Sequence, residues 1–421
     1  MASAFEAARA YGHARHIAGA IGTRLAGSDA DARTAHFLHE AFEAAGLSVQ
    51  ERTFPILTGA VSAHKLEVLS PTRREATCAP FVLAGTTPDE GVVGAPFWIG
   101  PGHRFEGAEG KIAFWRLGSR TELLLRFDEL AAQRPLAVVV LWPSAGDLPK
   151  HQRVSEARAR SGGAPPSLAI RREEGDALAQ AQPSLVRVLL KGTTAESASR
   201  NVIAELPGDE RPEEVIVVGA HMDTAPVAAG AIDNASGLAI TLELATVFAA
   251  SGSRRTLRFV GWGAEKAGMV GSRRYVEALS AAERAAHRLC ISIDGVGAAL
   301  GKLVCYRVGC EALQQAVRDA SENACAGVEV RAGFYGTDSE MFVQAGVPAL
   351  SFGQEGPALS YLHTEEDNLA KIDPTRLGVA GRCVEQVLRA ADASPAWPFA
   401  PSVQSQDRAF ATTLLRQMGW L

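Results

Sequence analysis

A short run of β-branched residues that leads into a histidine and two acids constrains the fold of this chain most strongly. Residues 215–218 read Val-Ile-Val-Val, which is typical of a parallel strand covered on both faces. His221 and Asp223 follow this run, and Asp233 comes next in a Gly-Ala-Ile-Asp-Asn turn. Open α/β sheets bind ligands beyond the carboxyl ends of their strands. We therefore expect an α/β fold in which His221 and Asp233 bind a metal and Asp223 orients the His221 ring.

A His-x-Asp pair after a strand is by itself more often an ordinary hydrogen-bonded pair than a metal site. Further strand-like runs, however, are also followed by acidic, basic or imidazole groups. These groups are Glu265 and Lys266 after residues 256–262, Asp294 after residues 290–293, and His363 in the downstream segment YLHTEEDNL. Because parallel strands end at the same edge of a sheet, we expect these side chains to converge on one site.

Together these motifs resemble the di-zinc aminopeptidases, the clan MH metallopeptidase family that also contains glutaminyl cyclase and glutamate carboxypeptidase. The resemblance covers residues 201–374 and rests on the His-x-Asp of His221, GAIDNASG with Asp233, AEKAGMVGS with Glu265, the strand-end Asp294 and the HTEED of His363. It implies a doubly wound mixed α/β sheet of the zinc aminopeptidase type. It also implies a metal held by His221, Asp233 and Asp294, with Glu265 as the catalytic base and a cis peptide bond after Asp233.

Lys266 departs from the family pattern, in which a second glutamate at this position binds the second zinc. We therefore expect zinc at one ion per chain, with Mn, Co or Fe as alternatives because carboxylate and imidazole ligands also suit them. Three alternatives stay open for Lys266. Its ammonium group takes the place of the second zinc, pairing with Asp233 near His363; or it is carbamylated and restores a carboxylate ligand; or it turns out to solvent.

The resemblance implies metal-dependent hydrolysis of an amide bond in a peptide or a small N-acyl or aminoacyl compound, with Glu265 as the catalytic base. We also expect Lys266 and His363 to act as catalytic residues. Two alternatives remain: a repurposed scaffold that performs a transamidation or lyase step, and a non-catalytic binding homologue. The segment GFYGTDSEMF resembles the family's substrate pocket and places Tyr335, Thr337 and Asp338 near the metal. Alternatively, Asp338 serves as the N-cap of the helix that follows it.

Changes in sequence pattern along the chain divide it into four parts. These are an N-terminal part of the catalytic domain (1–54), an inserted domain (55–193), the metallopeptidase catalytic domain (194–393) and a C-terminal tail (394–421). The insertion contains short strand-like runs broken by Gly and Pro, which predicts a β-rich module with one or two helices and resembles a protease-associated domain.

Local patterns predict individual elements within these parts. In the first part we expect helices over residues 3–20 and 29–45, with Ser28 as the N-cap of the second. In the catalytic domain we expect strands over 301–308, 328–332 and 349–352 and helices over 311–323, 339–345 and 375–391. The tail carries an apolar stripe that predicts docking on its own domain or on a second subunit as a homo-oligomer. The stripe consists of Phe410, Leu414, Leu415, Met418 and Trp420.

The composition of the chain excludes some classes of binding partner. The formal net charge is -5, which argues against a nucleic-acid partner or a basic membrane-binding patch and leaves a peptide or small amide as the expected substrate. Residues 1–24 carry charge throughout, and no segment is apolar and long enough to span a bilayer, so the expected location is the cytoplasm. The six cysteines lack metal-binding or redox spacing and are expected to be reduced.

Overall fold

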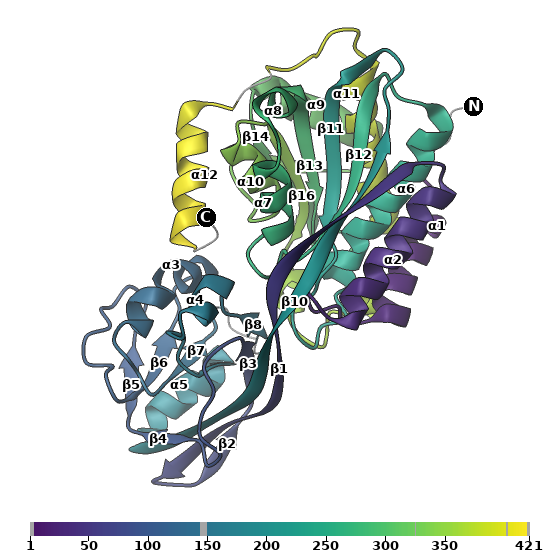
Figure 1. Cartoon of the computed structure of the whole chain (residues 1–421). Coiled ribbons are helices and arrows are strands. Elements are labelled where there is room, and N and C mark those ends of the chain that lie inside the picture. The colour runs from purple at the N-terminus through teal and green to yellow at the C-terminus, as the bar shows by residue number, and fades with distance from the viewer. Residues whose placement is uncertain (1–3, 144–149, 325, 401–402, 419–421) are drawn as a thin grey trace. The chain divides into compact units, whose positions relative to one another are not determined.

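The computed structural model of the protein describes residues 4–143, 150–324, 326–400 and 403–418. The chain divides into two compact units (Figure 1). Unit 1 comprises Met1–Ile56, Ala198–Thr224 and Ala228–Leu414, and unit 2 comprises Leu57–Ser197, Ala225–Val227 and Leu415–Leu421. The insertion expected from the sequence ran over residues 55–193, and the long continuous part of unit 2 runs over residues 57–197.

Unit 1 is built on a mixed sheet in which the strands lie in the order β15-β14-β16-β13-β11-β12-β10-β1. The central strands β12, β11, β13 and β16 run parallel to one another, whereas β10 and β14 run antiparallel to β12 and β16. The strands are β1 (Ser48–Ser70), β10 (Leu185–Leu206), β11 (Arg211–His221), β12 (Arg255–Trp262), β13 (His287–Ile293), β14 (Lys302–Val308), β15 (Glu329–Ala332) and β16 (Ala349–Glu355). The expected mixed, doubly wound α/β sheet is therefore confirmed.

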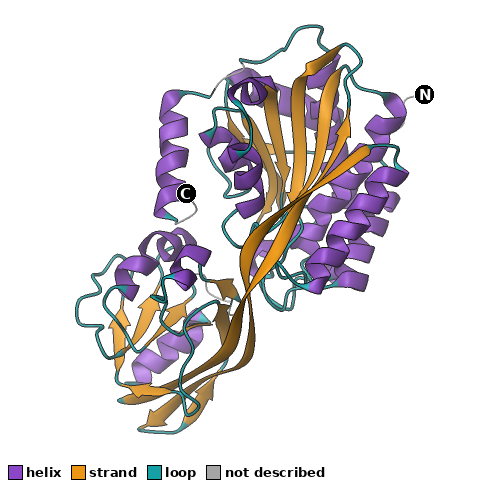
Figure 2. Ribbon diagram, viewed as in Figure 1, coloured by secondary structure: helices purple, strands orange, loops and turns teal. Residues whose placement is uncertain are grey.

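Helices cover both faces of this sheet (Figure 2). Helix α6 (Ser236–Ser251) packs on β11 and is itself covered by α1 and α11, so it is buried along almost its whole length. This explains its composition of small and aliphatic residues, because a helix enclosed on all sides has no polar face. The other helices of the unit are α1 (Ala7–Ala14), α2 (Asp29–Ala44), α7 (Val270–Glu277), α8 (Ala281–Ala286), α9 (Glu311–Asn323), α10 (Ser339–Gln344) and α11 (Pro374–Ala393).

Local signals located most of these elements to within a few residues. Helix α2 begins as expected, because the Ser28 hydroxyl accepts a hydrogen bond from the backbone N–H of Asp31 at 3.2 Å. The helix expected over residues 3–20 is different: the α-helix ends at Ala14, and a π-helix, η1 (Arg15–Ile21), continues it. The π-helix closes with the N–H of Gly22 donating to the carbonyl of Ile17, five residues back.

Unit 2 contains a second sheet with strand order β5-β6-β7-β9-β3-β8, of which β5, β6, β7 and β9 are parallel. The strands that lie within unit 2 are β2 (Arg74–Ala76), β3 (Cys78–Val82), β4 (Val92–Gly94), β5 (Pro96–Ile99), β6 (Ile112–Arg116), β7 (Ala137–Leu141), β8 (Gln152–Arg153) and β9 (Ser167–Ile170). Strands β2 and β4 pair with β1 and β10, which begin or end in unit 1.

The described part of unit 2 contains the helices α3 (Arg120–Ala131), α4 (Glu156–Arg160) and α5 (Arg172–Ala181), so the module is rich in strands as expected but contains more than the expected one or two helices. The sequence pattern did not predict α5, because Gly175 lies in its middle and glycine disfavours helix. In the structure this glycine allows α5 to approach β7 closely. A Cβ atom at Gly175 would lie only 2.2 Å from the Leu141 Cδ2 atom.

The tail forms helix α12 (Ser405–Gln417). Within unit 1, the Phe410 ring packs 5.1 Å from the ring of Phe334, so this part of the predicted apolar stripe docks on its own chain. Trp420 lies outside the described residues. The cysteines in the described ranges are free thiols. No helix among the described residues has both the length and the apolar character needed to cross a bilayer.

Candidate metal centre

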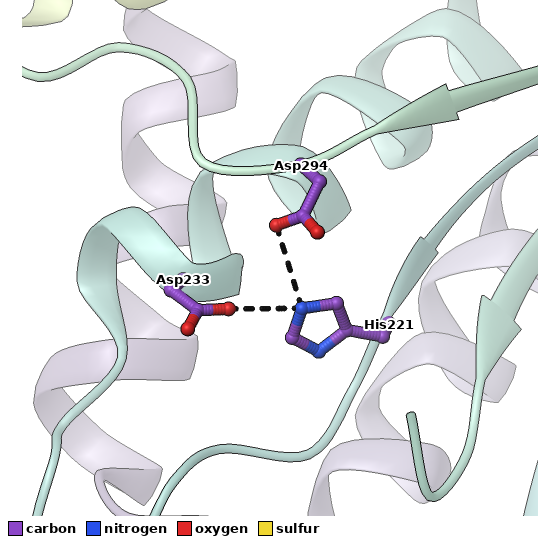
Figure 3. Close-up of side chains that lie close together, drawn as sticks. All are labelled: His221, Asp233 and Asp294. Atoms are coloured by element: carbon purple, nitrogen blue, oxygen red, sulfur yellow. Dashed lines mark ion pairs between the residues drawn. The ribbon is translucent and has the colours of Figure 1, made fainter. Parts of the chain in front are cut away.

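Three side chains from separate segments of unit 1 converge beyond the ends of β11 and β13 (Figure 3). His221 is the last residue of β11, Asp294 directly follows β13, and Asp233 lies in the π-helical turn η2 (Ala231–Ala235). The His221 Nε2 atom is 2.9 Å from Asp233 Oδ1 and 3.5 Å from Asp294 Oδ1. Across the described ranges, no other group of three His, Cys, Asp or Glu side chains offers donor atoms this close together.

The His221 ring is oriented by a backbone group rather than by the carboxylate expected from the sequence. Its Nδ1–H donates to the backbone carbonyl of Asp223 at 2.9 Å, whereas the nearest Asp223 carboxylate oxygen is 3.8 Å away. The carboxylate instead accepts the backbone N–H groups of Glu265 and Lys266, each at 2.9 Å. The Asp223 carboxylate thus fixes the loop that carries the candidate base. The Asp223 carbonyl binds His221 Nδ1–H, and this orients the ring so that Nε2 faces Asp233 and Asp294.

Asp367, to which the sequence assigned no role, holds Asp233 in place. Its carboxylate accepts the backbone N–H groups of Ile232 and Asp233 at 2.7 and 3.1 Å. The Asp233-Asn234 peptide bond is cis, as the resemblance implied. Asp367 is the last residue of the HTEED segment that also carries His363. That motif was the available signal for this residue, but spacing alone did not indicate its backbone partners.

Arg24 is a second residue whose role the sequence did not predict. Its fully buried guanidinium donates to the carbonyl oxygens of Met222, Ala229 and Gly230 at 2.9, 2.7 and 3.1 Å. These carbonyls belong to the segment that connects β11 to η2. Arg24 therefore fixes the path of the chain between two candidate ligands, His221 and Asp233.

Lys266 points into the centre. Its Nζ atom lies 2.8 Å from Asp233 Oδ1, 2.9 Å from Glu265 Oε2 and 3.3 Å from His221 Nε2. The side chain is only 14% exposed, so the alternative in which it turns out to solvent is wrong. Its closest Asp233 oxygen is Oδ1, the one that faces His221, whereas His363 Nε2 lies 3.1 Å from Oδ2.

Burial and charge act against each other throughout this cluster. Burial raises the pKa of Glu265, and Lys266 and His221 only partly offset that rise. Burial would also raise the pKa of Asp233, but Lys266, His221 and His363 outweigh it and hold that pKa well below its usual range. Lys266 itself has a raised pKa, because Asp233, Glu265 and Asp294 outweigh the effect of burial. Without a metal, the centre therefore holds a charged lysine against ionised Asp233.

The predicted pocket segment, residues 333–342, follows β15 and continues into α10. Asp338 occupies the N-cap position of α10, as the alternative expected, but its side chain makes no capping hydrogen bond. It instead accepts a hydrogen bond from the Ser272 hydroxyl at 2.5 Å, and burial followed by the charge of Glu265 raises its pKa well above the usual range. The Thr337 hydroxyl lies 2.9 Å from that of Ser292. The Tyr335 hydroxyl donates to the carbonyl of Gln354 at 3.3 Å.

The residues of the centre fit a divalent metal. One imidazole nitrogen and two carboxylates are a donor set that zinc accepts, and three protein ligands leave a position open for catalysis. Among the described residues, the buried Asp233 Oδ1 and Glu265 Oε2 atoms have no aligned hydrogen-bond partner in spite of their close cationic neighbours. A buried oxygen atom without such a partner is costly, and a metal ion held by His221, Asp233 and Asp294 would satisfy Asp233 Oδ1.

Comparisons with known proteins relate this chain to a family and to solved structures. The model of Peptidase family M28 matches residues 201–388. Aminopeptidase YwaD of Bacillus subtilis (strain 168) is 26% identical over 400 residues, which cover 90% of this chain and 84% of that protein.

Two solved structures share the fold over nearly the whole chain. The structure of BSAP, a zinc aminopeptidase from Bacillus subtilis, matches with a TM-score of 0.75 and 25% identity, covering 95% of this chain and 99% of that chain. A Peptidase M28 precursor from Shewanella amazonensis SB2B matches with a TM-score of 0.80 and 22% identity, covering 94% and 96%. Residues 201–388 thus form a peptidase family M28 domain, and the chain is a hydrolase of the metallopeptidase type.

Proposed function

We propose that this chain hydrolyses an amide bond in a peptide or in a small N-acyl or aminoacyl compound, with one zinc ion per chain held by His221, Asp233 and Asp294. The observation that carries the proposal is the convergence of these three donors beside a buried carboxylate. Glu265 Oε2 lies 3.9 Å from His221 Nε2, within one water molecule's reach of the centre. The match to Peptidase family M28 supports the same chemistry.

The metal and the residues around it have separate tasks in this reaction. When bound, the metal supplies Lewis acidity that lowers the pKa of water and polarises the amide carbonyl. Glu265 takes the proton of the attacking water and delivers it to the leaving amine, and its raised pKa suits a group that must both accept and donate. Asp223 keeps the backbone of Glu265 in place through its hydrogen bond to the Glu265 N–H.

The remaining residues shape the site. We assign Lys266 and His363 to the catalytic group because both lie at Asp233, and Tyr335 and Asp338 to the substrate pocket. Unit 2 is proposed to be the protease-associated-like insertion. A transamidation or lyase step on the same scaffold and a non-catalytic binding homologue remain the competing functions.

A substrate panel with metal analysis separates these functions. Purified protein is assayed against aminoacyl amides, dipeptides and N-acyl amino acids while its metal content is measured. Release of free amine that depends on the metal supports the proposal. Bound metal without turnover of any member supports the binding homologue, and products other than hydrolysis products support the repurposed scaffold.

Substitution of Glu265 tests the base directly. Glu265→Gln keeps the size of the side chain but removes its basicity, so turnover should fall roughly a hundredfold or more while zinc binding persists. Glu277→Gln, an exposed glutamate on α7, is the matched control and should leave turnover unchanged. Wild-type turnover in Glu265→Gln would remove Glu265 from the mechanism.

The metal assignment has its own test. His221→Ala removes one of three ligands and should abolish zinc retention through gel filtration. Lys266→Glu would supply a carboxylate beside Asp233 and His363, so it should raise the metal content from one to two per chain. Two tightly bound ions in the unmodified protein would contradict the assignment of one metal.

A further inference from the structure

Lys266 and the candidate metal site share one oxygen atom. Asp233 Oδ1 lies 2.9 Å from His221 Nε2 and 2.8 Å from Lys266 Nζ. The same ammonium lies 3.3 Å from His221 Nε2 itself. A lysine side chain therefore contacts two of the three atoms that would bind the metal, and a divalent ion at this site must bind next to a fixed positive charge.

The surroundings keep this charge in place. The Lys266 backbone N–H donates to the Asp223 carboxylate at 2.9 Å, which fixes the start of the side chain. At the other end, the ammonium group contacts Asp233 and Glu265, and both carboxylates are buried. A lysine held at both ends in a buried site cannot easily withdraw, and its charge is screened far less there than it would be at the surface.

The charge has a consequence for the substrate as well as for the metal. The α-nitrogen of an aminoacyl substrate is separated from the scissile carbonyl carbon by only one carbon atom. When that carbonyl is at the metal, a free α-ammonium group is thus confined to the same small region as Lys266 Nζ. Two ammonium groups a few ångströms apart in a buried site repel strongly, whereas an acylated α-nitrogen carries no charge.

We propose that Lys266 is a fixed cation that weakens metal binding at the His221, Asp233 and Asp294 site and directs the enzyme to amides whose α-nitrogen is uncharged, such as N-acyl aminoacyl amides. The substrate half of this inference rests on the proposed hydrolase function, but the metal half does not require turnover. Lys266 is thereby a specificity-determining residue of the site.

The metal half is tested on metal-stripped protein by competition for Zn²⁺ with a chelator of known affinity. Lys266→Met and Lys266→Gln remove the charge, so both should bind Zn²⁺ at least about tenfold more tightly than the unmodified protein. Lys302→Met, which removes an exposed lysine on β14, is the control and should not change the affinity. Equal or weaker Zn²⁺ binding in folded Lys266→Met and Lys266→Gln would overturn this half.

The substrate half is tested by comparing each aminoacyl amide with its N-acetyl derivative. In the unmodified protein, kcat/KM should favour the N-acetyl compound by about tenfold or more, and Lys266→Met should shift the ratio toward the free amine by a similar factor. A preference of the unmodified protein for the free amine would overturn this half without any variant. If the unmodified protein binds Zn²⁺ but turns over neither compound of any pair, the proposed function is refuted. The competition for Zn²⁺ would still decide whether Lys266 weakens metal binding.

Discussion

Asp367 illustrates at the scale of single residues how the candidate metal centre depends on groups other than the three candidate ligands. It accepts two backbone N–H groups, one of them from Asp233. Burial, followed by the charge of Asp233, raises the pKa of Asp367 to about 7. A buried carboxylate that accepts two hydrogen bonds from the backbone is a positioning group, because only a correctly folded turn presents those N–H groups to it.

We expect Asp367→Asn to weaken Zn²⁺ binding by about tenfold to a hundredfold. An amide has one oxygen where the carboxylate has two, so one of the backbone N–H groups would face an NH₂ group and the turn would shift. The measurement is chelator competition, as for Lys266. Glu366→Gln, on the exposed neighbour that pairs with Lys371, is the control. An unchanged Zn²⁺ affinity in Asp367→Asn would show that the turn is fixed by other contacts.

At the scale of elements, the segment between β11 and η2 is fixed by a side chain from the N-terminal region. Arg24 lies between η1 and α2 and donates to three carbonyls of that segment, and also to the carbonyl of Gly22 at 2.6 Å. A planar guanidinium with five N–H donors suits several carbonyl oxygens at once, and a lysine does not. One side chain therefore ties the N-terminal elements to the loop that carries Asp233.

Arg24→Lys keeps the charge but loses this geometry. We expect it to lower the free energy of unfolding by about 3 kcal/mol or more, because buried carbonyl groups lose their partners and a buried charge loses hydrogen bonds. Urea denaturation followed by circular dichroism measures the change. The control is Arg33→Lys on the exposed face of α2, which should change the free energy by less than about 0.5 kcal/mol. Equal stability of the two variants would contradict the role given to Arg24.

At the scale of the whole molecule, the free energy of unfolding depends on pH through buried acids. Burial raises the pKa of such an acid when no cationic partner is close enough to offset it. Asp31, in the first turn of α2, is 3% exposed and accepts the backbone N–H of Gly27 at 2.9 Å. Burial raises its pKa from 3.8 to about 6, although the Gly27 N–H acts in the opposite direction. The folded chain therefore binds this proton more tightly than the unfolded chain does.

The sign of the effect follows from that difference. Between about pH 4 and 6 the folded state holds more protons at Asp31, so stability decreases as the pH rises through this window, by an amount on the order of 3 kcal/mol. We expect Asp31→Asn to remove this decrease, so the difference in unfolding free energy between variant and unmodified protein should change across pH 4 to 6 and be constant above it. Chelator is present throughout, so that metal binding adds no pH dependence of its own.

Asp29→Asn is the control for this measurement, because Asp29 lies in the same helical turn but is exposed. Its difference from the unmodified protein should vary much less with pH. The same flat profile in Asp31→Asn would show that the carboxyl group of Asp31 keeps an ordinary pKa in the folded protein.

The sequence by itself determined the features that depend on local patterns. The β-branched run of β11 predicted a covered parallel strand, Ser28 predicted the start of α2, and the strand-end positions of His221 and Asp294 predicted that they would meet. These predictions hold because a parallel strand covered on both faces is apolar along its whole length, and because helix capping and the shared edge of a parallel sheet follow from backbone geometry.

Tertiary structure alone decided which partner each polar group takes. The Asp223 carboxylate turns to the N–H groups of Glu265 and Lys266 rather than to His221, Asp338 takes Ser272 rather than a helix cap, and Lys266 faces Asp233 rather than solvent. Asp367 and Arg24 bind backbone atoms of segments far away in the sequence. A hydrogen bond to a distant backbone group leaves no periodic trace in the sequence, because it depends on where separate loops meet in the folded chain.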